Sequence, residues 1–395
     1  MASTTVWLVV GLIVGLVVGI AIGYAVMPPK VVTKTVTVTK YVNVTTTTNV
    51  TTPVTTTTTV STAPFAVGAA GTLKFAFGDI LNVMQSMYPS ITIAPAMFKG
   101  SGEVAHTEAT TQQFSVVASA DTTTIPSVLF PNYTNYEIAF GITQMVIIVD
   151  LNTTAGQEVY QLWQQAQSYP PLSAQYNETW QKIWQIIALN SSTVVGVSNP
   201  FTDPSGYQAQ CVVKLAGLAF FNNASYLYNA IYGNPSKYMM RNTEIDLLTL
   251  MTSGQVDFIL SAYESNAIPQ TQTYHNTVFI TLPPFINLGN LSYVNYYHQV
   301  SVTWTENGVT KTFACNPVVY TITIPFQAPN KQAAEYFLLL LYSPIGQKIL
   351  EENGIVPIIP GIVYGNYSAV PNAIKPFVAP LSQYPQYASI FPSQG

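Results

Sequence analysis

The distribution of hydrophobic positions separates an apolar N-terminal segment from the rest of the chain. Val6–Met27 is an unbroken apolar run that ends at Pro28-Pro29. As a helix it is long enough to cross a hydrocarbon core of roughly 30 Å. A cleaved signal peptide is the alternative, but its apolar part usually covers only about 7–15 residues and follows a basic segment. We therefore expect residues 1–29 to form a retained, single-pass transmembrane anchor. Four glycines at every fourth position share one face of this helix, where a partner helix could pack closely: Gly11, Gly15, Gly19 and Gly23.

A Thr/Val tract follows the apolar segment, and residues 30–70 are interpreted as a stalk. Positions 31 to 64 are almost entirely Thr, Val and Lys and show no apolar periodicity from which a core could be built. This composition is typical of an extended, O-glycosylated spacer. Asn-x-Ser/Thr sequons begin in the stalk and continue beyond it, at Asn43, Asn49, Asn132, Asn152, Asn177, Asn190, Asn223, Asn290 and Asn366. Stalk and sequons together favour a glycoprotein in the cell membrane with its head on the extracellular side.

From residue 71 onward, short apolar runs alternate with amphipathic segments. The runs predict strands at Leu73–Phe77, Ile91–Ala96, Val116–Ala118, Met145–Val149, Val194–Val197 and Val318–Ile324. Helices are expected at Asn82–Tyr88, Glu158–Gln167, Glu178–Leu189, Lys331–Tyr342 and Ile345–Asn353. The alternation indicates an α/β fold with mainly parallel sheets. The last segment, 362–395, is rich in Pro and Tyr and is interpreted as a C-terminal tail.

Composition narrows the classes of function. Only 8% of the residues are charged, against about 25% in ordinary globular proteins. Such a surface suits an exported protein in acidic or harsh surroundings. A net charge of −4 with 13 Lys and Arg offers no basic face for nucleic acid. The two cysteines, Cys211 and Cys315, are too few for a disulfide framework or a metal cluster. Whether they pair or stay as buried thiols is left open by the sequence.

Catalytic signatures are absent from the sequence, and we do not expect an enzyme. There is no G-x-S-x-G turn, no P-loop and no H-E-x-x-H motif. What recurs is a polar turn at the start of a helix, at Gly78-Asp79, Gly100-Ser101-Gly102, Asp203–Tyr207 and Glu244. Several helix N-termini around one cleft can bind an anion without Lys or Arg. The alternative for each turn is ordinary N-capping.

At these turns the sequence resembles the archaeal tungstate/molybdate-binding proteins of ABC importers, members of the type II periplasmic-binding-protein superfamily. The resemblance extends from about Leu73 to Pro357 and is carried by Ala118–Phe140, Gly196–Gln210 with its SNP and DPSGY motifs, Thr243–Phe258 and Asn316–Asn330. It implies a two-lobed α/β fold with an interlobe cleft. Lobe 1 would hold residues 71–141 and 325–361, and lobe 2 would hold residues 142–324.

The resemblance also implies a ligand site without a separate cofactor. The carboxylates of Asp203 and Glu244 would approach the tungsten or molybdenum atom of the oxoanion, and the hydroxyl of Ser101 would bind an oxo group. Tyr263 lies one residue out of register with the tyrosine of the family pattern. The chain departs from the family at Asp79, in place of a first-turn serine, and at Gln208 and His106, in place of arginines.

The expected function is therefore that of a membrane-anchored, extracytoplasmic solute-binding protein that captures tungstate or molybdate and delivers it to an ABC permease. Two alternatives stay open. The cleft could bind another oxyanion, such as phosphate or sulfate. The fold could instead serve a glycosylated cell-surface protein that binds no small anion.

Overall fold

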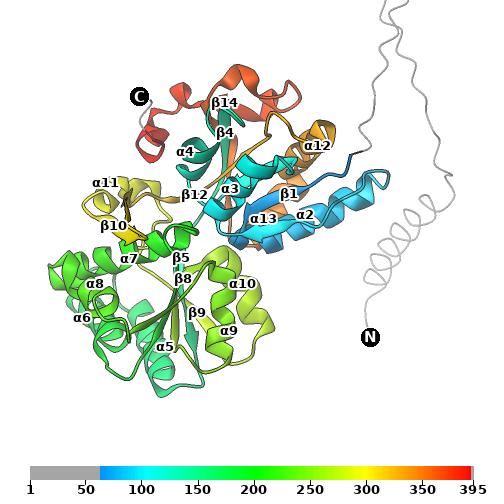
Figure 1. The fold of residues 1–395 in the computed structure, drawn as a ribbon. Coiled ribbons are helices and arrows are strands. Elements are labelled where there is room, and N and C mark those ends of the chain that lie inside the picture. Colours follow the sequence, from blue (N-terminus) through cyan, green and yellow to red (C-terminus); the bar gives the residue numbers. More distant parts are fainter. Residues whose placement is uncertain (1–62, 393–395) are drawn as a thin grey trace, which may run out of the picture. The chain divides into compact units, whose positions relative to one another are not determined.

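The computed structural model describes residues 63–392, which form two α/β lobes (Figure 1). No helix within this range is long and apolar enough to cross a membrane. The transmembrane anchor and most of the stalk that the sequence predicts lie outside the described residues.

Lobe 1 is built on a seven-stranded mixed sheet. Its strand order is β14-β13-β4-β12-β3-β1-β2. The strands are β1 (Val67–Ala70), β2 (Met97–Lys99), β3 (Val116–Ser119), β4 (Tyr136–Thr143), β12 (Val318–Thr323), β13 (Val356–Gly365) and β14 (Val378–Pro380). β1 runs parallel to both of its neighbours, whereas β12 is antiparallel to β3 and β4. The carboxyl end of β1 is followed directly by the 3₁₀ turn Gly71–Leu73, and the first long helix begins after this turn.

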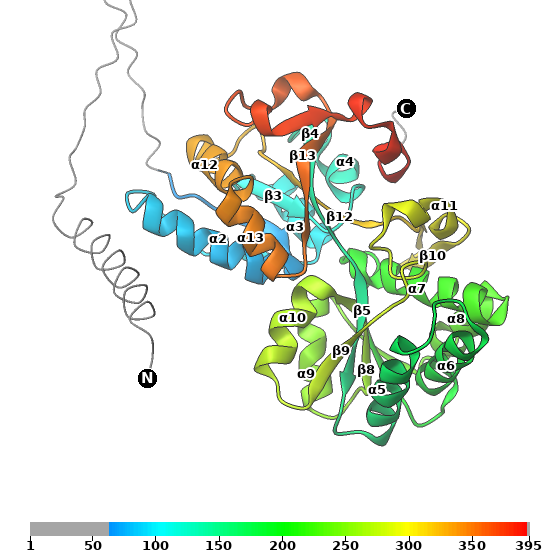
Figure 2. The same cartoon turned by 180° about the vertical axis from the view of Figure 1, so that it is seen from behind.

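Helices cover both faces of this sheet. One face carries α2 (Lys74–Met87), α12 (Lys331–Leu341) and α13 (Pro344–Glu352), which lie together in Figure 2. The other face carries α3 (Ser101–Thr111) and α4 (Thr124–Leu129), packed through a separate apolar cluster. Near the C-terminus the described chain forms short 3₁₀ turns at Tyr367–Ala369, Lys375–Phe377, Leu381–Gln383 and Pro385–Ile390.

Lobe 2 contains a five-stranded sheet of order β7-β6-β8-β5-β9. The strands are β5 (Met145–Asp150), β6 (Val195–Ser198), β7 (Tyr238–Arg241), β8 (Phe258–Tyr263) and β9 (Thr277–Thr281). One face packs against α5 (Thr154–Gln167), α6 (Ala174–Trp184) with its π-helical extension Gln185–Leu189, α7 (Pro204–Phe221) and α8 (Ala224–Tyr232). The other face packs against the 3₁₀ turn Glu244–Asp246, α9 (Leu247–Thr252) and α10 (Glu264–Thr273).

The chain crosses between the lobes twice. Gln144 alone separates β4 of lobe 1 from β5 of lobe 2. The return path runs from β9 through the 3₁₀ turn Leu291–Tyr293, α11 (Val294–Tyr297) and a β-hairpin to β12. Two crossings of this kind permit the lobes to move relative to each other as units.

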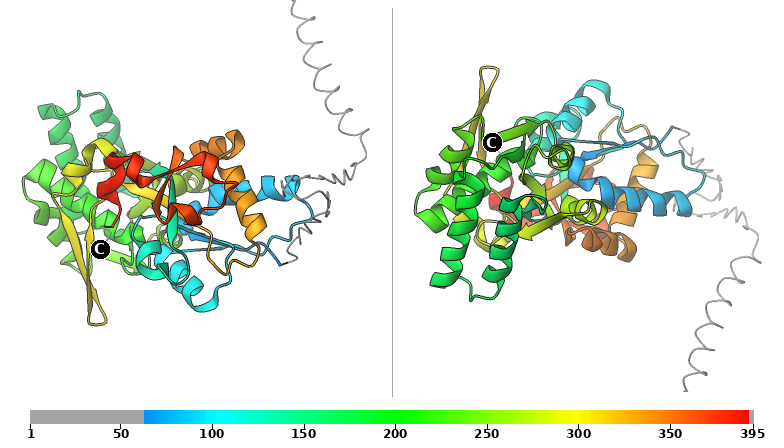
Figure 3. Two further views of the ribbon diagram at one scale, coloured as in Figure 1. Left: turned by 90° about the horizontal axis from the view of Figure 1, so that it is seen from above. Right: turned by 90° about the horizontal axis from the view of Figure 1, so that it is seen from below.

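The hairpin on the return path consists of β10 (Ser301–Glu306) and β11 (Val309–Ala314), and it projects from the body of the head in Figure 3. Its turn is Asn307-Gly308, with φ values of 51° and 78°. An Asn-Gly pair tolerates these left-handed conformations and is the preferred two-residue hairpin turn. Just beyond β11, Cys315 forms a disulfide with Cys211 on α7, which settles the pairing that the sequence left open.

The structure confirms several elements that the sequence predicted and corrects others. The strands predicted at 116, 145, 194 and 318 are present as β3, β5, β6 and β12. The strand predicted at Leu73–Phe77 is wrong, because β1 lies earlier and these residues belong to the start of α2 and the 3₁₀ turn before it. The strand predicted at Ile91–Ala96 is replaced by β2, with one bridge from Ile93 to Phe65. Beyond Ile362, β13 and β14 continue the sheet of lobe 1.

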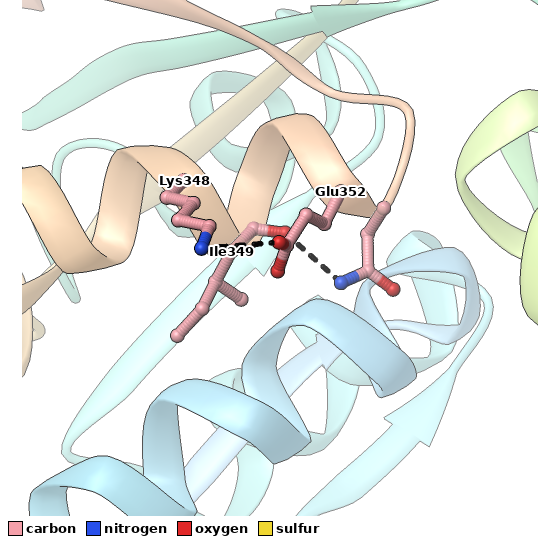
Figure 4. A network of polar contacts seen from close by, with 4 residues as sticks. Lys348, Ile349 and Glu352 are labelled. Atoms are coloured by element: carbon pink, nitrogen blue, oxygen red, sulfur yellow. Dashed lines mark hydrogen bonds and ion pairs between the residues drawn. The ribbon is translucent and has the colours of Figure 1, made fainter. Parts of the chain in front are cut away.

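Ion pairs contribute little to the stability of the described part of the chain. Its one ion pair within 4.0 Å joins Lys348 to Glu352 at 3.6 Å on the exposed side of α13 (Figure 4). An exposed pair of this kind stabilises a protein by at most about 1 kcal/mol. The polar groups of the head are therefore held mainly by hydrogen bonds of hydroxyl, amide and backbone groups. This is consistent with the small share of charged residues in the chain.

Candidate functional site

Two buried carboxyl groups meet where lobe 2 faces lobe 1. Asp203 caps the N-terminus of α7, and its Oδ1 accepts a hydrogen bond from the backbone N–H of Ser205 at 3.0 Å. Its Oδ2 accepts hydrogen bonds from the hydroxyl of Ser205 and from the backbone N–H of Glu244, both at 2.8 Å. Only 3% of Asp203 and 2% of Glu244 is exposed. The two acidic residues, 41 positions apart, are thus held at one point.

One carboxylate oxygen of Glu244 accepts a hydrogen bond, and the other has no hydrogen-bond partner. Oε2 accepts a hydrogen bond from the hydroxyl of Thr243 at 2.9 Å, whereas Oε1 is buried without a hydrogen-bond partner. Burial, followed by the negative charge of Asp203, raises the pKa of Glu244 well above its usual range. A buried polar atom without a partner is costly unless something else satisfies it. Oε1 points across the interlobe boundary, since a Cβ atom on Gly71 would lie 2.9 Å from it.

Hydroxyl groups surround this point from the lobe 1 side. Thr72 lies in the turn after β1, and its hydroxyl forms hydrogen bonds with the hydroxyls of Ser265 and Tyr320. The Tyr320 and Ser265 hydroxyls are 2.7 Å apart. Burial raises the pKa of Tyr320, and the charges of Glu244 and Asp203 raise it further. Ser101 begins α3, and its hydroxyl accepts a hydrogen bond from the backbone N–H of Ala120 at 3.0 Å.

Tyr263 and Gln208 close the site on the lobe 2 side. Tyr263 is the N-cap of α10 and is fully buried. Its hydroxyl donates a 2.6 Å hydrogen bond to Oε1 of Gln208 on α7. Burial, and then the charges of Asp203 and Glu244, raise the pKa of Tyr263 well above its usual range. Gln208 is thus a neutral side chain that holds the tyrosine in place.

The lobes are in direct contact around the site. The backbone N–H of Gly102 donates a hydrogen bond to the carbonyl oxygen of Thr202 at 3.2 Å. A Cβ atom on Gly100 would lie only 2.0 Å from the same oxygen. The hydroxyl of Tyr207, on α7, donates a 2.9 Å hydrogen bond to Asp121 of lobe 1. The structure therefore presents the closed arrangement of the two lobes, with the carboxyl pair inside.

The structure brings four of the five sequence-predicted site residues together: Ser101, Asp203, Glu244 and Tyr263. Asp79 is not among them, because it is exposed in the middle of α2. The turn after the first strand of lobe 1 is Gly71–Leu73, so Thr72 stands at the place in the fold where the sequence analysis expected Asp79. The placement of Asp79 at the site is thus wrong, because the strand expected before it, Leu73–Phe77, is in fact the 3₁₀ turn and the start of α2. His106 is likewise exposed, on α3.

Three residues of the site escaped the sequence analysis: Thr72, Ser265 and Tyr320. Thr72 had a detectable signal, since Gly71-Thr72-Leu73 follows a run of small apolar residues and matches the Gly-Ser-Leu turn of the family. Ser265 and Tyr320 had none, because isolated hydroxyl side chains are common in this chain and only the fold brings them to Thr72.

The site offers hydroxyl donors from both lobes and two carboxyl groups at one point. In the described residues no group of three or more His, Cys, Asp and Glu side chains could hold a free metal ion. Hydroxyls instead suit the oxo groups of an anion, and carboxylate oxygens suit a hard metal centre. The arrangement fits a ligand that presents both features.

Comparison with known proteins identifies the family of the chain. The family described as bacterial extracellular solute-binding protein matches residues 65–356. The molybdate/tungstate-binding protein WtpA of Thermococcus kodakarensis is 31% identical over 280 residues, which are 67% of this chain and 71% of that protein. An uncharacterized solute-binding protein of Petrotoga mobilis is 30% identical over 295 residues, 74% of this chain and 83% of that protein.

Among solved structures, one match is the periplasmic molybdate-binding protein of Azotobacter vinelandii. Its TM-score is 0.47 at 15% identity, and the match covers 74% of this chain and 98% of that one. The family match over residues 65–356 covers lobe 2, most of lobe 1 and every residue of the site described above. The chain therefore belongs to the family of extracellular solute-binding proteins, whose members bind ligands rather than transform them.

Proposed function

We propose that the protein captures tungstate or molybdate between its two lobes, as a membrane-anchored binding protein with its head outside the cell, and delivers the oxoanion to an ABC permease. The observation that carries this proposal is the free Oε1 atom of Glu244. It is buried beside Asp203 and directed at the Gly71-Thr72 turn of the opposite lobe. The WtpA relatives, named for molybdate and tungstate, support the same ligand class.

The chemistry of the carboxyl pair argues for these two oxoanions over sulfate or phosphate. Two carboxylates next to a dianion repel it by Coulomb's law. They become favourable only when their oxygens donate electron pairs to the central atom. Tungsten and molybdenum can accept additional oxygen ligands as hard, high-valent metals. Thr72 and Ser101 would donate hydrogen bonds to the oxo groups, whereas the hydroxyl proton of Tyr263 is donated to Gln208.

Membrane anchoring and transfer to a permease rest on the sequence. Val6–Met27 is long enough to span a bilayer, and the Thr-rich stalk would hold the head away from the membrane. Seven sequons fall within the head, and five of their asparagines are exposed: Asn132, Asn152, Asn190, Asn223 and Asn366. This distribution is compatible with a glycosylated outer surface, which we include in the proposal.

The test is a calorimetric titration of the purified full-length protein with tungstate, molybdate, sulfate and phosphate. We expect strong binding of tungstate or molybdate and weak or no binding of the other two. Glu244→Gln should abolish most of this binding, and Glu352→Gln, an exposed change of equal charge on α13, should leave it unchanged. Sulfate or phosphate binding that survives Glu244→Gln would establish a different oxyanion as the ligand. No response to any of the four anions would favour a surface role for the fold.

A further inference from the structure

A cavity lies at the interlobe boundary, next to the buried carboxyl pair. It has a volume of about 320 Å³, and its lining reaches Asp203 on one side and the β10–β11 hairpin on the other. Lobe 1 contributes α3 and α4, and lobe 2 contributes the start of α7. The cavity is thus adjacent to the proposed ligand site and open to solvent.

The hairpin is fixed as one wall of this cavity by contacts at its base and near its tip. At its base, the Cys211–Cys315 disulfide joins it to α7. Also near the base, the ring of Phe313 stacks on Tyr207 with the ring centroids 4.4 Å apart and the planes 6° from parallel. Near its tip, Oε2 of Glu306 accepts a 2.8 Å hydrogen bond from the side chain of Asn199.

This wall places a cation at the cavity. Nζ of Lys311 lies 4.9 Å from the ring centroid of Phe201, which faces it from the loop before α7. The Phe201 backbone N–H is in turn bound to Oδ1 of Asn199 at 2.8 Å. Lys311 is exposed, makes no ion pair within 4.0 Å in the described part of the chain, and lines the cavity together with His106 of lobe 1.

The anionic groups at the cavity are already occupied by donors. Asp121 accepts hydrogen bonds from the hydroxyls of Ser119, Thr123 and Tyr207 and from the backbone of Thr123 and Thr124. Asp203 accepts the three hydrogen bonds described above. A dianion that approaches from solvent meets their residual negative charge together with the overall charge of −4. The ammonium group of Lys311 opposes this repulsion at the point of entry.

We propose that this cavity is an outer anion site, in which Lys311 holds the oxoanion before it enters the buried site. The inference rests on the proposed function, because it assigns a path to the same ligand. A positive charge at the mouth of a cleft raises the association rate of an anion and loses this effect when salt screens it.

The test is stopped-flow binding of tungstate and molybdate to the full-length protein at roughly 10 mM and roughly 500 mM salt. Lys311→Met removes the charge but keeps an aliphatic side chain on Phe201. We expect its association rate constant to fall about 3- to 10-fold at low salt and to match the wild type at high salt. The dissociation rate constant should stay unchanged. Lys311→Arg should retain the wild-type rates, and Lys348→Gln, which changes the net charge equally on α13, should have no effect.

Unchanged association in Lys311→Met, with normal binding by the wild type, would overturn the outer site and leave the proposed function intact. A faster dissociation without slower association would also overturn it, because Lys311 would then stabilise the bound state and not the approach. Failure of the wild type to bind either oxoanion would overturn the proposed function and this inference together.

Discussion

The backbone N–H of Glu244 donates a 2.8 Å hydrogen bond to Oδ2 of Asp203. The first residue of the 3₁₀ turn Glu244–Asp246 thus binds the side chain that caps α7. The contact fixes the distance between two acidic side chains that would otherwise repel each other. It also leaves Oε1 of Glu244 free towards lobe 1. The carboxyl pair is therefore arranged before a ligand arrives, and little ordering remains to be done on binding.

Removal of either carboxylate should weaken binding of the oxoanion strongly. In Asp203→Asn the cap can still accept one hydrogen bond, but the negatively charged oxygen donor is lost. We expect the affinity for tungstate or molybdate to fall by about 30- to 1,000-fold, equivalent to about 2–4 kcal/mol. Isothermal titration calorimetry measures the effect. Asp79→Asn, on the exposed face of α2, is the matched control, and an equal loss in this variant would contradict our assignment of the first turn.

Closure of the lobes depends on the absence of a side chain at Gly100. In Gly100→Ala the new Cβ atom would lie 2.0 Å from the carbonyl oxygen of Thr202. The φ of −56° at Gly100 suits alanine, so the clash arises only between the lobes. We expect at least about a tenfold loss of affinity and a larger radius of gyration with ligand, measured by small-angle X-ray scattering.

Gly78→Ala provides the control for this substitution. No atom lies within 4 Å of a Cβ built at this position, which is inside α2. Alanine should therefore stabilise the helix by up to about 1 kcal/mol and leave ligand affinity unchanged. Wild-type affinity in Gly100→Ala would show that the contact between Gly100 and Thr202 is not needed for binding.

The stability of the head should decrease as the pH rises above the ordinary range of a glutamate. Burial raises the pKa of Glu108 from 4.5 to about 7, and burial raises the pKa of Glu137 well above its usual range. The folded state thus keeps protons that the unfolded state releases. Stabilisation by these neutral acids is complete below pH 4.5 and is lost as the pH rises through the folded pKa.

Urea denaturation at a series of pH values checks this expectation. In Glu108→Gln the amide oxygen can replace Oε2 as acceptor for the N–H of Phe114, but the group no longer titrates. The wild type should lose about 1–3 kcal/mol relative to this variant between pH 4.5 and 8. Glu352→Gln, on the exposed side of α13, should follow the wild type. Parallel curves for Glu108→Gln and the wild type would refute the assignment.

The disulfide should contribute substantially to stability. Cys211 and Cys315 are 104 positions apart, so the bridge restricts a long loop of the unfolded chain. We expect Cys211→Ser/Cys315→Ser to lower the free energy of unfolding by about 2–5 kcal/mol. Guanidinium denaturation with and without reductant measures the change. The reduced wild type should match the double variant, and a wild type that is insensitive to reductant would argue against the bridge.

Strands buried on both faces were the easiest part of the fold to predict. Every residue of Met145–Asp150 and of Val318–Thr323 is buried, and both read as continuous apolar runs. β1 escaped detection because Val67–Ala70 consists of small side chains. The larger apolar residues that follow, such as Phe77 and Ile80, line the buried face of α2. Over a short stretch of sequence, such closely spaced apolar residues cannot be distinguished from those of a strand.

The site was predictable where its residues begin helices. Asp203 and Glu244 stand in recognisable motifs, and both are buried at the interlobe boundary. The first turn was displaced to Asp79 because the preceding strand was misplaced by one element. The hairpin had a clear signal in Asn307-Gly308 between two alternating segments, yet the cavity behind it depends on packing between distant residues, which periodicity does not encode.

In the sheet of lobe 1, the interior strand β4 lies between β12 and β13. Gly141 of β4 pairs with Tyr320 of β12 on one side and with Pro357 of β13 on the other. The sheet of lobe 1 starts in the N-terminal part of the head and is therefore complete only when these late strands have joined it. A proteolytic cut or premature stop before Val356 would expose one edge of β4 to other chains. Loss of β13 and β14 is thus expected to cause aggregation, although no residue of the candidate site lies on these strands.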